Sequence, residues 1–413
     1  MITRRNATSL FAGTAITAAL GAASTPARAE DKVIKIGADL SLTGADSENA
    51  QRIKNALIMA VDAANTNKTV KGYTFELMTL DDGTATAGQY DPAQAATNAR
   101  KMVSDSDVVA AVGPEMSGAG KAMAPILSQG DLATITPSST NPDITSPKFA
   151  EQYRPAGKAI YFRTVTTDAY QGPNMANFMA EKLKIKSVYI LDDSGAYGVG
   201  IADSYQGQIE KKGVKVLGRD RLDPKAADYM AVLTKIKSLN PEALYYGGVG
   251  QAGVKLAKQA YDIIPDVIKA GGDGVYGATF LTGVGFPAAE GWYATIASPH
   301  LTGDTKAADF IKAYSARWKI APTDYAITGY DAALVIIDAV KQVADSGKPV
   351  NRSAVRDAIQ SSKVQTIQGV ISFDANGDLA DRTVSVFQVK KNDGGAPDDV
   401  SAQYHYIEVA PQV

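Results

Sequence analysis

The sequence predicts an α/β protein with two units of similar rhythm, each built on a parallel sheet. Three observations lead to this prediction. Short apolar segments alternate with longer segments whose apolar residues recur at helical spacing. The alternation begins near residue 33, is interrupted at 142–159 by a segment with prolines and lysines, and then begins again. Such alternation is typical of parallel sheets whose strands are joined by helices, and 413 residues suffice for two units.

The first unit opens with the apolar segment VIKIGA, which predicts a strand at 33–38. A helix is expected at 52–65, because apolar residues recur there every three or four positions. The elements expected next are a strand at 75–80, a helix at 92–104, a strand at 108–112, a helix ending at 129 and a strand at 132–135.

The second unit begins with the extended segment AIYFRT and a helix at 170–183. Four strands separated by helical segments are then expected, at 187–191, 215–218, 243–246 and 267–270. Towards the C-terminus, the sequence predicts an apolar helix at 330–343 and two strands, at 369–373 and 384–389. The segment DANGD between those strands has the composition of a hairpin turn.

The composition argues against several classes of function. There are 42 basic and 44 acidic residues and no stripe of lysine and arginine, so no nucleic-acid partner is expected. The chain has no cysteine and two histidines, which makes a zinc site improbable, and no metal or other cofactor is predicted. No nucleophile-elbow, phosphate-loop or related catalytic motif occurs.

The first residues have the order of a signal peptide. Arg4 and Arg5 precede an uncharged stretch at 7–23, and the small residues around Arg28 follow. The stretch is short and weakly apolar for a membrane anchor. We therefore expect a signal peptide at 1–29, cleavage after Ala29 and a soluble, monomeric protein in the periplasm. The arginine pair admits the twin-arginine route as well as the general secretory route.

Two loops that follow predicted strands are rich in hydroxyl groups. The segment GPEMSGAG contains Ser117, and TPSSTNP contains Ser138, Ser139 and Thr140. Ligands of parallel α/β sheets bind at the C-terminal ends of strands. One interpretation is structural, with Ser117 as the N-cap of a helix and the other hydroxyls forming turns. The other is that both loops bind one carboxylate together.

Three further segments have open interpretations. Asp273 in GGDG is either a turn residue or a counter-charge for a cation, and Tyr197 in SGAYG is either a surface residue or a cover for a ligand side chain. The segment GVGQAG matches a dinucleotide fingerprint, with Asp273 twenty residues past Gly253. An exported NAD-dependent oxidoreductase is therefore an alternative, although the motif comes after several strand–helix units.

Taken in order, these segments resemble a known family. The markers are IKIGADLSLTG, AVDAAN, LDDGTAT, NARKMV, AAVGPEMSG, ATITPSSTNP, YFRTVTTDAYQGP, DDSGAYGVG, ALYYGG and GGDG. They are similar to segments of the branched-chain amino-acid (Leu/Ile/Val) type of periplasmic binding protein, the receptor subunit of an ABC transporter. The resemblance covers residues 32 to about 390.

The resemblance implies a non-enzymatic receptor with two Rossmann-like lobes, three crossovers as a hinge and a ligand cleft between the lobes. One lobe would comprise 31–165 and 300–373, and the other 166–299 and 374–413. The implied partners are a small amino acid and the permease subunits in the inner membrane. A sensor of the same fold, which hands its ligand to a membrane receptor, is a further alternative.

The resemblance also implies roles for single residues. Ser117 and Thr140 match the hydroxyls that bind the ligand α-carboxylate, and Ser138 matches the residue whose carbonyl accepts from the α-ammonium group. Asp273 matches the acid that pairs with the ammonium group, and Tyr197 matches an aromatic wall of the side-chain pocket. Ser139 completes the candidate hydroxyl set.

The match departs from the family around the side-chain pocket. The first loop offers Ser47, Glu48 and Asn49 where many relatives show an aromatic residue, and Val249 stands where an aromatic residue can occur. The chain also lacks the disulfide that the family often has. A branched-chain or other aliphatic amino acid is the expected ligand, and amides or aromatic acids are the alternatives.

Overall fold

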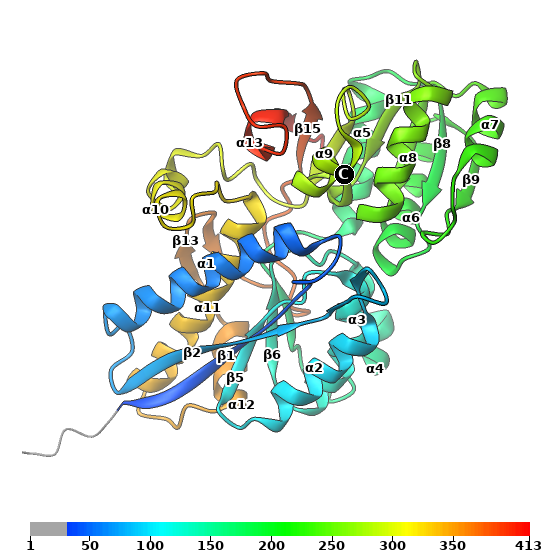
Figure 1. Cartoon of the computed structure of the whole chain (residues 1–413). Coiled ribbons are helices and arrows are strands. Elements are labelled where there is room, and N and C mark those ends of the chain that lie inside the picture. Colours follow the sequence, from blue (N-terminus) through cyan, green and yellow to red (C-terminus); the bar gives the residue numbers. More distant parts are fainter. Residues whose placement is uncertain (1–30) are drawn as a thin grey trace, which may run out of the picture.

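The computed structural model describes residues 31–413, which fold into two α/β lobes joined by three chain segments (Figure 1). The predicted fold class is confirmed. The signal peptide expected at 1–29 lies outside the described residues. Among residues 31–413, no helix has both the length and the apolar character that a membrane span requires.

The first lobe is built on a five-stranded sheet in which all neighbouring strands are parallel. The strand order is β2-β1-β5-β6-β7, with β1 (Lys32–Leu40), β2 (Tyr73–Asp81), β5 (Val108–Val112), β6 (Ala133–Thr136) and β7 (Tyr161–Arg163).

Helices cover both faces of this sheet. One face packs against α1 (Ser47–Thr66), α11 (Asp324–Asp345) and α12 (Arg352–Gln360). The other packs against α2 (Pro92–Ser104) and α3 (Ser117–Gln129). The short α4 (Ala150–Tyr153) contacts α3, and α10 (Ala308–Trp318) contacts α1. The helices α10 to α12 therefore complete a lobe whose five-stranded sheet comes entirely from the first part of the chain.

The second lobe is built on a seven-stranded sheet of order β16-β15-β12-β11-β10-β8-β9. Its strands are β8 (Ser187–Asp192), β9 (Lys215–Arg221), β10 (Ala243–Gly247), β11 (Ile268–Gly271), β12 (Tyr293–Ile296), β15 (Ser385–Val389) and β16 (Tyr404–Val409). The prediction of a parallel sheet is wrong for its last part, because β15 pairs antiparallel with both β12 and β16. These strands arrive from a distant part of the chain and need no helical crossover between them.

Helices also sandwich the second sheet. One face packs against α5 (Asp168–Glu181) and α6 (Ala196–Lys211). The other packs against α7 (Met230–Leu239), α8 (Gly250–Ile263) and α9 (Ala278–Val284). The short α13 (Val400–Gln403) precedes β16.

Two small antiparallel ribbons lie outside the main sheets. One pairs β3 (Gly83–Thr84) with β4 (Gln89–Tyr90), and the other pairs β13 (Val364–Thr366) with β14 (Gly369–Ile371). The turn expected at DANGD is present, and the amide of Gly377 donates to the carbonyl of Asp374. The strands on either side are not partners, however, because β14 pairs with β13 and β15 joins the second sheet.

The chain crosses between the lobes three times, after β7, after β12 and after β14. The crossing segments lie side by side. The amide of Thr166 donates to the carbonyl of Ala297 at 2.8 Å, and the Ser385 hydroxyl donates to the carbonyl of Ser298 at 2.9 Å. They thus form one hydrogen-bonded hinge.

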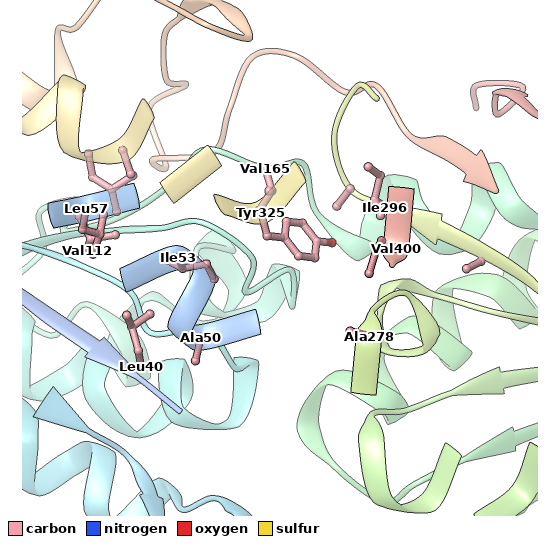
Figure 2. Packing of buried hydrophobic residues seen from close by; sticks show 14 of the residues in the cluster. Leu40, Ala50, Ile53, Leu57, Val112, Val165, Ala278, Ile296, Tyr325 and Val400 are labelled. Carbon is pink, nitrogen blue, oxygen red and sulfur yellow. The ribbon is translucent and has the colours of Figure 1, made fainter. Parts of the chain in front are cut away.

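The largest apolar cluster of buried residues extends through both lobes. Figure 2 shows Tyr325 and Val165 between Ile53 of the first lobe and Ile296 and Val400 of the second. The contact between the lobes is therefore partly apolar, close to the hinge.

Candidate ligand-binding site

A cavity of about 680 Å³, including its opening to solvent, lies between the two lobes. From the first lobe it is lined by Asp46, Glu48, Asn49, Glu115, Met116, Ser117, Ser138 and Tyr325. From the second lobe it is lined by Tyr197, Val249, Gly250, Asp273, Gly274, Tyr276, Gly277, Ala278, Thr279 and Phe280. Two of these lining residues, Tyr325 of the first lobe and Ala278 of the second, are labelled in Figure 2.

The loop GPEMSGAG reaches the cavity through a sharp turn at the end of β5. Gly113 has φ +109°, and a Cβ atom there would lie 2.3 Å from the carbonyl oxygen of Asp39. Only glycine fits this position without strain. The turn directs Glu115 and Ser117 towards the cleft.

Ser117 does not cap α3, contrary to the structural interpretation of its sequence. Met116 is the N-cap residue, and Ser117 is the first residue of the helix. The Ser117 hydroxyl instead accepts the backbone N–H of Asn141 at 3.2 Å and thereby connects the two hydroxyl-rich loops. Backbone N–H groups in a first helical turn have no partner within the helix. They and the Ser117 hydroxyl form a site suited to an anion.

The loop TPSSTNP is held in place by a buried arginine. Arg163, on the neighbouring strand β7, donates to the backbone carbonyls of Ser139 and Asn141 and pairs with Asp378 at 2.8 Å. The hydroxyl of Tyr161 donates to the Ser139 hydroxyl at 2.9 Å. The Ser139 side chain is therefore engaged inside the lobe, and it does not line the cavity.

The other two residues of this loop differ from Ser139. Ser138 lines the cavity, and its hydroxyl donates to the carbonyl of Glu115 at 3.1 Å. Thr140 is buried behind the lining, and its hydroxyl makes no hydrogen bond of normal geometry within the described chain, although it lies close enough to Asp168 to lower the pKa of that carboxyl. A buried polar group without a partner is costly, so Thr140 is available to a ligand that reaches it.

The structure thus brings the six predicted residues into one region. Four line the cavity, and two lie behind the lining: Ser117, Ser138, Tyr197 and Asp273 in the first group, Ser139 and Thr140 in the second.

Asp273 provides a buried acid on the second lobe. It begins the 3-10 turn η3 (Asp273–Val275) after β11, and it accepts a hydrogen bond from the hydroxyl of Tyr325. Tyr197 lies in the first turn of α6, and its hydroxyl accepts the N–H of Gly274 at 3.2 Å. Burial raises the pKa of Asp273 to about 6, although hydrogen bonds from Tyr197 and Tyr325 lower it. A ligand cation would restore the ionised form.

Asp168 is a second buried acid beside Asp273, and the sequence reasoning did not select it. It begins α5, and its Oδ2 atom has no partner within residues 31–413. Burial raises the pKa of Asp168 well above its usual value, and the charge of Asp273 raises it further. The sequence could have indicated Asp168, because it follows the predicted strand in AIYFRT, and ligand-binding residues of such sheets lie after the C-terminal ends of strands, as Asp273 does.

A third group of acids lies on the first lobe and was also missed. The amide of Asn49 donates to Oε1 of Glu115 at 2.8 Å, whereas Oε2 of Glu115 and Oδ2 of Asp46 have no partner in the described residues. Burial raises the pKa of Asp46 to about 7, and the charges of Asp82 and Asp193 contribute. Burial, followed by the charge of Asp46, raises the pKa of Glu115 well above its usual value.

The segment GVGQAG is a strand–turn–helix element, but its surroundings do not suit a dinucleotide. The carboxylate of Asp193 accepts the N–H of Val249 at 2.9 Å, directly before α8, where it would repel a phosphate. A Cβ atom on Gly248 would lie 2.3 Å from the Tyr246 hydroxyl and 2.7 Å from Cγ of Asp193. Local packing therefore explains this glycine without a cofactor.

A comparison with known families finds one match over most of the chain. A family model described as periplasmic binding protein matches residues 33–396.

Curated relatives match over similar lengths. A Leu/Ile/Val-binding protein homolog from Brucella melitensis is 29% identical over 356 residues, covering 86% of this chain and 91% of the relative. A leucine-, isoleucine-, valine-, threonine- and alanine-binding protein from Pseudomonas aeruginosa is 29% identical over 359 residues, covering 87% and 90%.

Solved structures share the fold at lower sequence identity. A branched-chain amino acid transporter substrate-binding protein from Streptococcus pneumoniae, in complex with isoleucine, has a TM-score of 0.75 at 23% identity and covers 91% of this chain and 100% of its own. A solute-binding protein from Rhodopseudomonas palustris, in complex with benzoate, has a TM-score of 0.75 at 19% identity, with coverage of 92% and 97%.

Proposed function

Because the chain belongs to the periplasmic binding protein family, we propose that it is the amino-acid receptor of an ABC transporter and holds its ligand between the lobes. It is a solute-binding protein and not an enzyme. One observation supports an amino acid most directly. Hydroxyls and a helix start on the first lobe face a buried acid on the second, which suits the two charges of a zwitterion.

The α-carboxylate is bound by the first lobe in this proposal. Ser117 and Thr140 supply hydroxyls, and the first turn of α3 supplies backbone N–H groups. Ser139 has a supporting role, since its carbonyl is fixed by Arg163 and its hydroxyl by Tyr161.

The α-ammonium group is bound by Asp273, with the buried acid Asp168 beside it. The carbonyl of Ser138 is the expected acceptor on the first lobe. Tyr197 lines the cavity with its ring, and its hydroxyl forms a hydrogen bond that lowers the pKa of Asp273. Charge-assisted hydrogen bonds of about 1.5–3 kcal/mol each are sufficient for micromolar affinity, near about −8 kcal/mol.

Binding stabilises the contact between the lobes, because each lobe contributes one half of the zwitterion site. Direct hydrogen bonds already cross the cleft. The amide of Asn141 donates to the carbonyl of Ala196 at 2.7 Å, and that of Gln251 to the carbonyl of Gly88 at 2.9 Å. The hydroxyl of Tyr325 donates to Asp273, and that of Tyr276 to Asp324 at 2.9 Å. Rotation about the hinge would open the cleft for ligand entry.

We further propose a cellular location for the protein and boundaries for its two lobes. The protein is exported through a signal peptide at 1–29 and works in the periplasm as a monomer with inner-membrane permease subunits. Its lobes comprise 31–165 with 300–373, and 166–299 with 374–413. The family model, described as periplasmic binding protein, supports the periplasmic location.

The test is a thermal-shift screen of ligand-stripped protein with the common amino acids, small amides, benzoate and NAD. A ligand at 100 times its dissociation constant stabilises the folded state by about 2.7 kcal/mol, which is easily detected. We expect a shift with at least one amino acid and none with NAD. Shifts with benzoate or amides alone would refute an amino-acid receptor.

Asp273→Asn tests the ammonium site by calorimetric titration with the amino acid found in the screen. The hydrogen bond from Tyr325 can persist, so the fold should be kept. Loss of a charge-assisted hydrogen bond should lower affinity on the order of 10- to 100-fold. Asp262→Asn, at an exposed position on α8, is the matched control. Equal affinity in wild type and Asp273→Asn would disprove the role of Asp273.

A further inference from the structure

Two buried carboxylates in the cleft have oxygen atoms that accept no hydrogen bond of normal geometry within the described chain. Glu115 is 4% exposed and Asp46 is 9% exposed, and both line the cavity. Oε2 of Glu115 and Oδ2 of Asp46 accept no hydrogen bond of normal geometry among residues 31–413, although the backbone N–H groups of Ser41 and Tyr90 lie close enough to lower the pKa of Glu115 and of Asp46, respectively. Buried polar atoms are almost always hydrogen-bonded, so two unpaired carboxylate oxygens in one cavity indicate donors that arrive with a ligand.

The Glu115 side chain is held by a chain of hydrogen bonds. Asn49 donates to Oε1 of Glu115 at 2.8 Å, and the hydroxyl of Thr323 donates to Oδ1 of Asn49 at 3.0 Å. One carboxylate oxygen is thereby fixed while the other stays free. Such a fixed acceptor is typical of a recognition site rather than of a solvated acid.

The charge of the cleft is one-sided. Its lining contains the acids Asp46, Glu48, Glu115 and Asp273, and, within the described residues, no lysine, arginine or histidine. Arg52 pairs with Glu48, but no basic side chain pairs with Asp46 or Glu115. An amino acid with a neutral apolar side chain would leave both carboxylates buried and unpaired, which is unfavourable.

The cavity also has an apolar part that would suit an alkyl chain. Met116, Val249 and Phe280 contribute to its lining. A bare metal ion fits less well, because no three His, Cys, Asp or Glu side chains in the described part are grouped as metal ligands. Both features favour an organic cation on a flexible methylene chain.

We propose that Glu115 and Asp46 form a cation subsite for the ligand side chain, so that the ligand is an amino acid with a basic side chain of the lysine or ornithine type. This inference rests on the proposed amino-acid receptor. It differs from the aliphatic ligand expected from the family resemblance, and it gives a function to the departure at Ser47, Glu48 and Asn49, because Asn49 orients Glu115.

The experiment compares matched ligands by calorimetric titration of ligand-stripped protein. Lysine and norleucine share the α-groups and the methylene chain but differ in the terminal ammonium group, and ornithine and norvaline form a second pair. We expect the basic member of each pair to bind at least about tenfold more tightly, as a charge-assisted hydrogen bond predicts. Leucine, glutamine and benzoate complete the panel.

Variants locate the effect in the cleft. Glu115→Gln keeps the acceptor that Asn49 uses and removes the charge, and Asp46→Asn does the same at the second carboxylate. Both should weaken lysine binding about tenfold or more and leave norleucine nearly unchanged. Glu76→Gln, which removes an exposed acid from β2, is the control and should change neither.

The outcomes separate the two proposals. If leucine or norleucine binds as tightly as lysine in the wild type, the cation subsite is refuted and the amino-acid receptor stands. Preference for glutamine over lysine also refutes it. If no amino acid binds, both proposals fail. The comparison of ligands in the wild type decides the question even if a variant does not fold.

Discussion

Arg163 is the residue on which the geometry of the hydroxyl loop depends. It is fully buried and contacts the carbonyls of Ser139 and Asn141 as well as Asp378. Removing one partner of a buried ionic group leaves polar atoms without partners, whereas an exposed ion pair contributes little.

Arg163→Ala should therefore lower the free energy of unfolding by about 3 kcal/mol or more. Arg317→Ala, which removes an exposed ion pair with Asp62, should lower it by less than about 1 kcal/mol. Urea denaturation at pH 7 measures both values. Similar losses in the two variants would contradict a special role for the buried arginine.

At the residue scale, strand-end reasoning found one half of the candidate site. Ser117 and Asp273 follow strands directly, and both line the cavity. Glu115 and Asp46 were missed because single acids in polar loops usually face solvent, and nothing local in the sequence marks them as buried. Their burial depends on contacts between segments that are distant in the sequence, such as Asn49 with Glu115, and a linear pattern does not show such contacts.

At the scale of elements, α11 shows that the spacing of apolar residues can predict a helix without predicting where it begins. The apolar pattern predicted a helix at 330–343, but α11 extends over Asp324–Asp345. Its first turns contain Asp324 and Thr328, which are buried polar residues and give no apolar signal. In the second sheet, β15 was predicted as a strand, but β12 and β16 were not, and the antiparallel pairing of β15 was not foreseen. Most residues of β16 are exposed, so it has no continuous apolar signal.

Thr323 links the start of α11 to the cleft. Its hydroxyl accepts the N–H of Ala326 as an N-cap and donates to Asn49, which orients Glu115. Thr323→Ala should lower the free energy of unfolding by about 1 kcal/mol and also weaken binding of a basic amino acid. Thr323→Ser keeps the hydroxyl and should restore both. Urea denaturation and titration with lysine test this, and a stability loss without an affinity loss would separate the cap from the site.

At the scale of the whole molecule, the buried acids make stability depend on pH. Burial raises the pKa of Asp46 to about 7 and that of Asp82 to about 6, and Asp193 and Tyr90 lie near Asp46 without supplying a positive charge. The pKa of Asp273 is also about 6. Their values in the unfolded chain are about 4, so the folded state binds more protons between about pH 4 and 7.

The ligand-free protein should therefore lose stability as pH rises from 5 to 7.5. Thermal unfolding across this range measures the trend, and Asp46→Asn should flatten it because a neutral amide cannot ionise. A saturating basic ligand should flatten it as well, since it favours the ionised carboxylates. A melting temperature that rises with pH in the ligand-free wild type would contradict this account.

The presence of two lobes, by contrast, could be anticipated from the sequence, because the alternation of strands and helices stops and restarts once. The position of the boundary was wrong, however, because the strand in AIYFRT, with which the second unit was expected to begin, is β7 of the first sheet. The mixed second sheet could not be anticipated, because the sequences of β15 and β16 do not indicate which strands they pair with. Pairing between distant segments depends on the hinge, where the crossing segments are already held together by hydrogen bonds.

Because the chain crosses between the lobes three times, the elements of each lobe are not synthesised consecutively. The strands of the first sheet are made early, but α11 and α12, which cover one of its faces, leave the ribosome only after β8 to β12 have been made. Until then, of the three helices on that face, only α1 is available to cover it. A growing chain therefore cannot finish its first lobe as an independent domain, and it reaches either native lobe only when nearly complete.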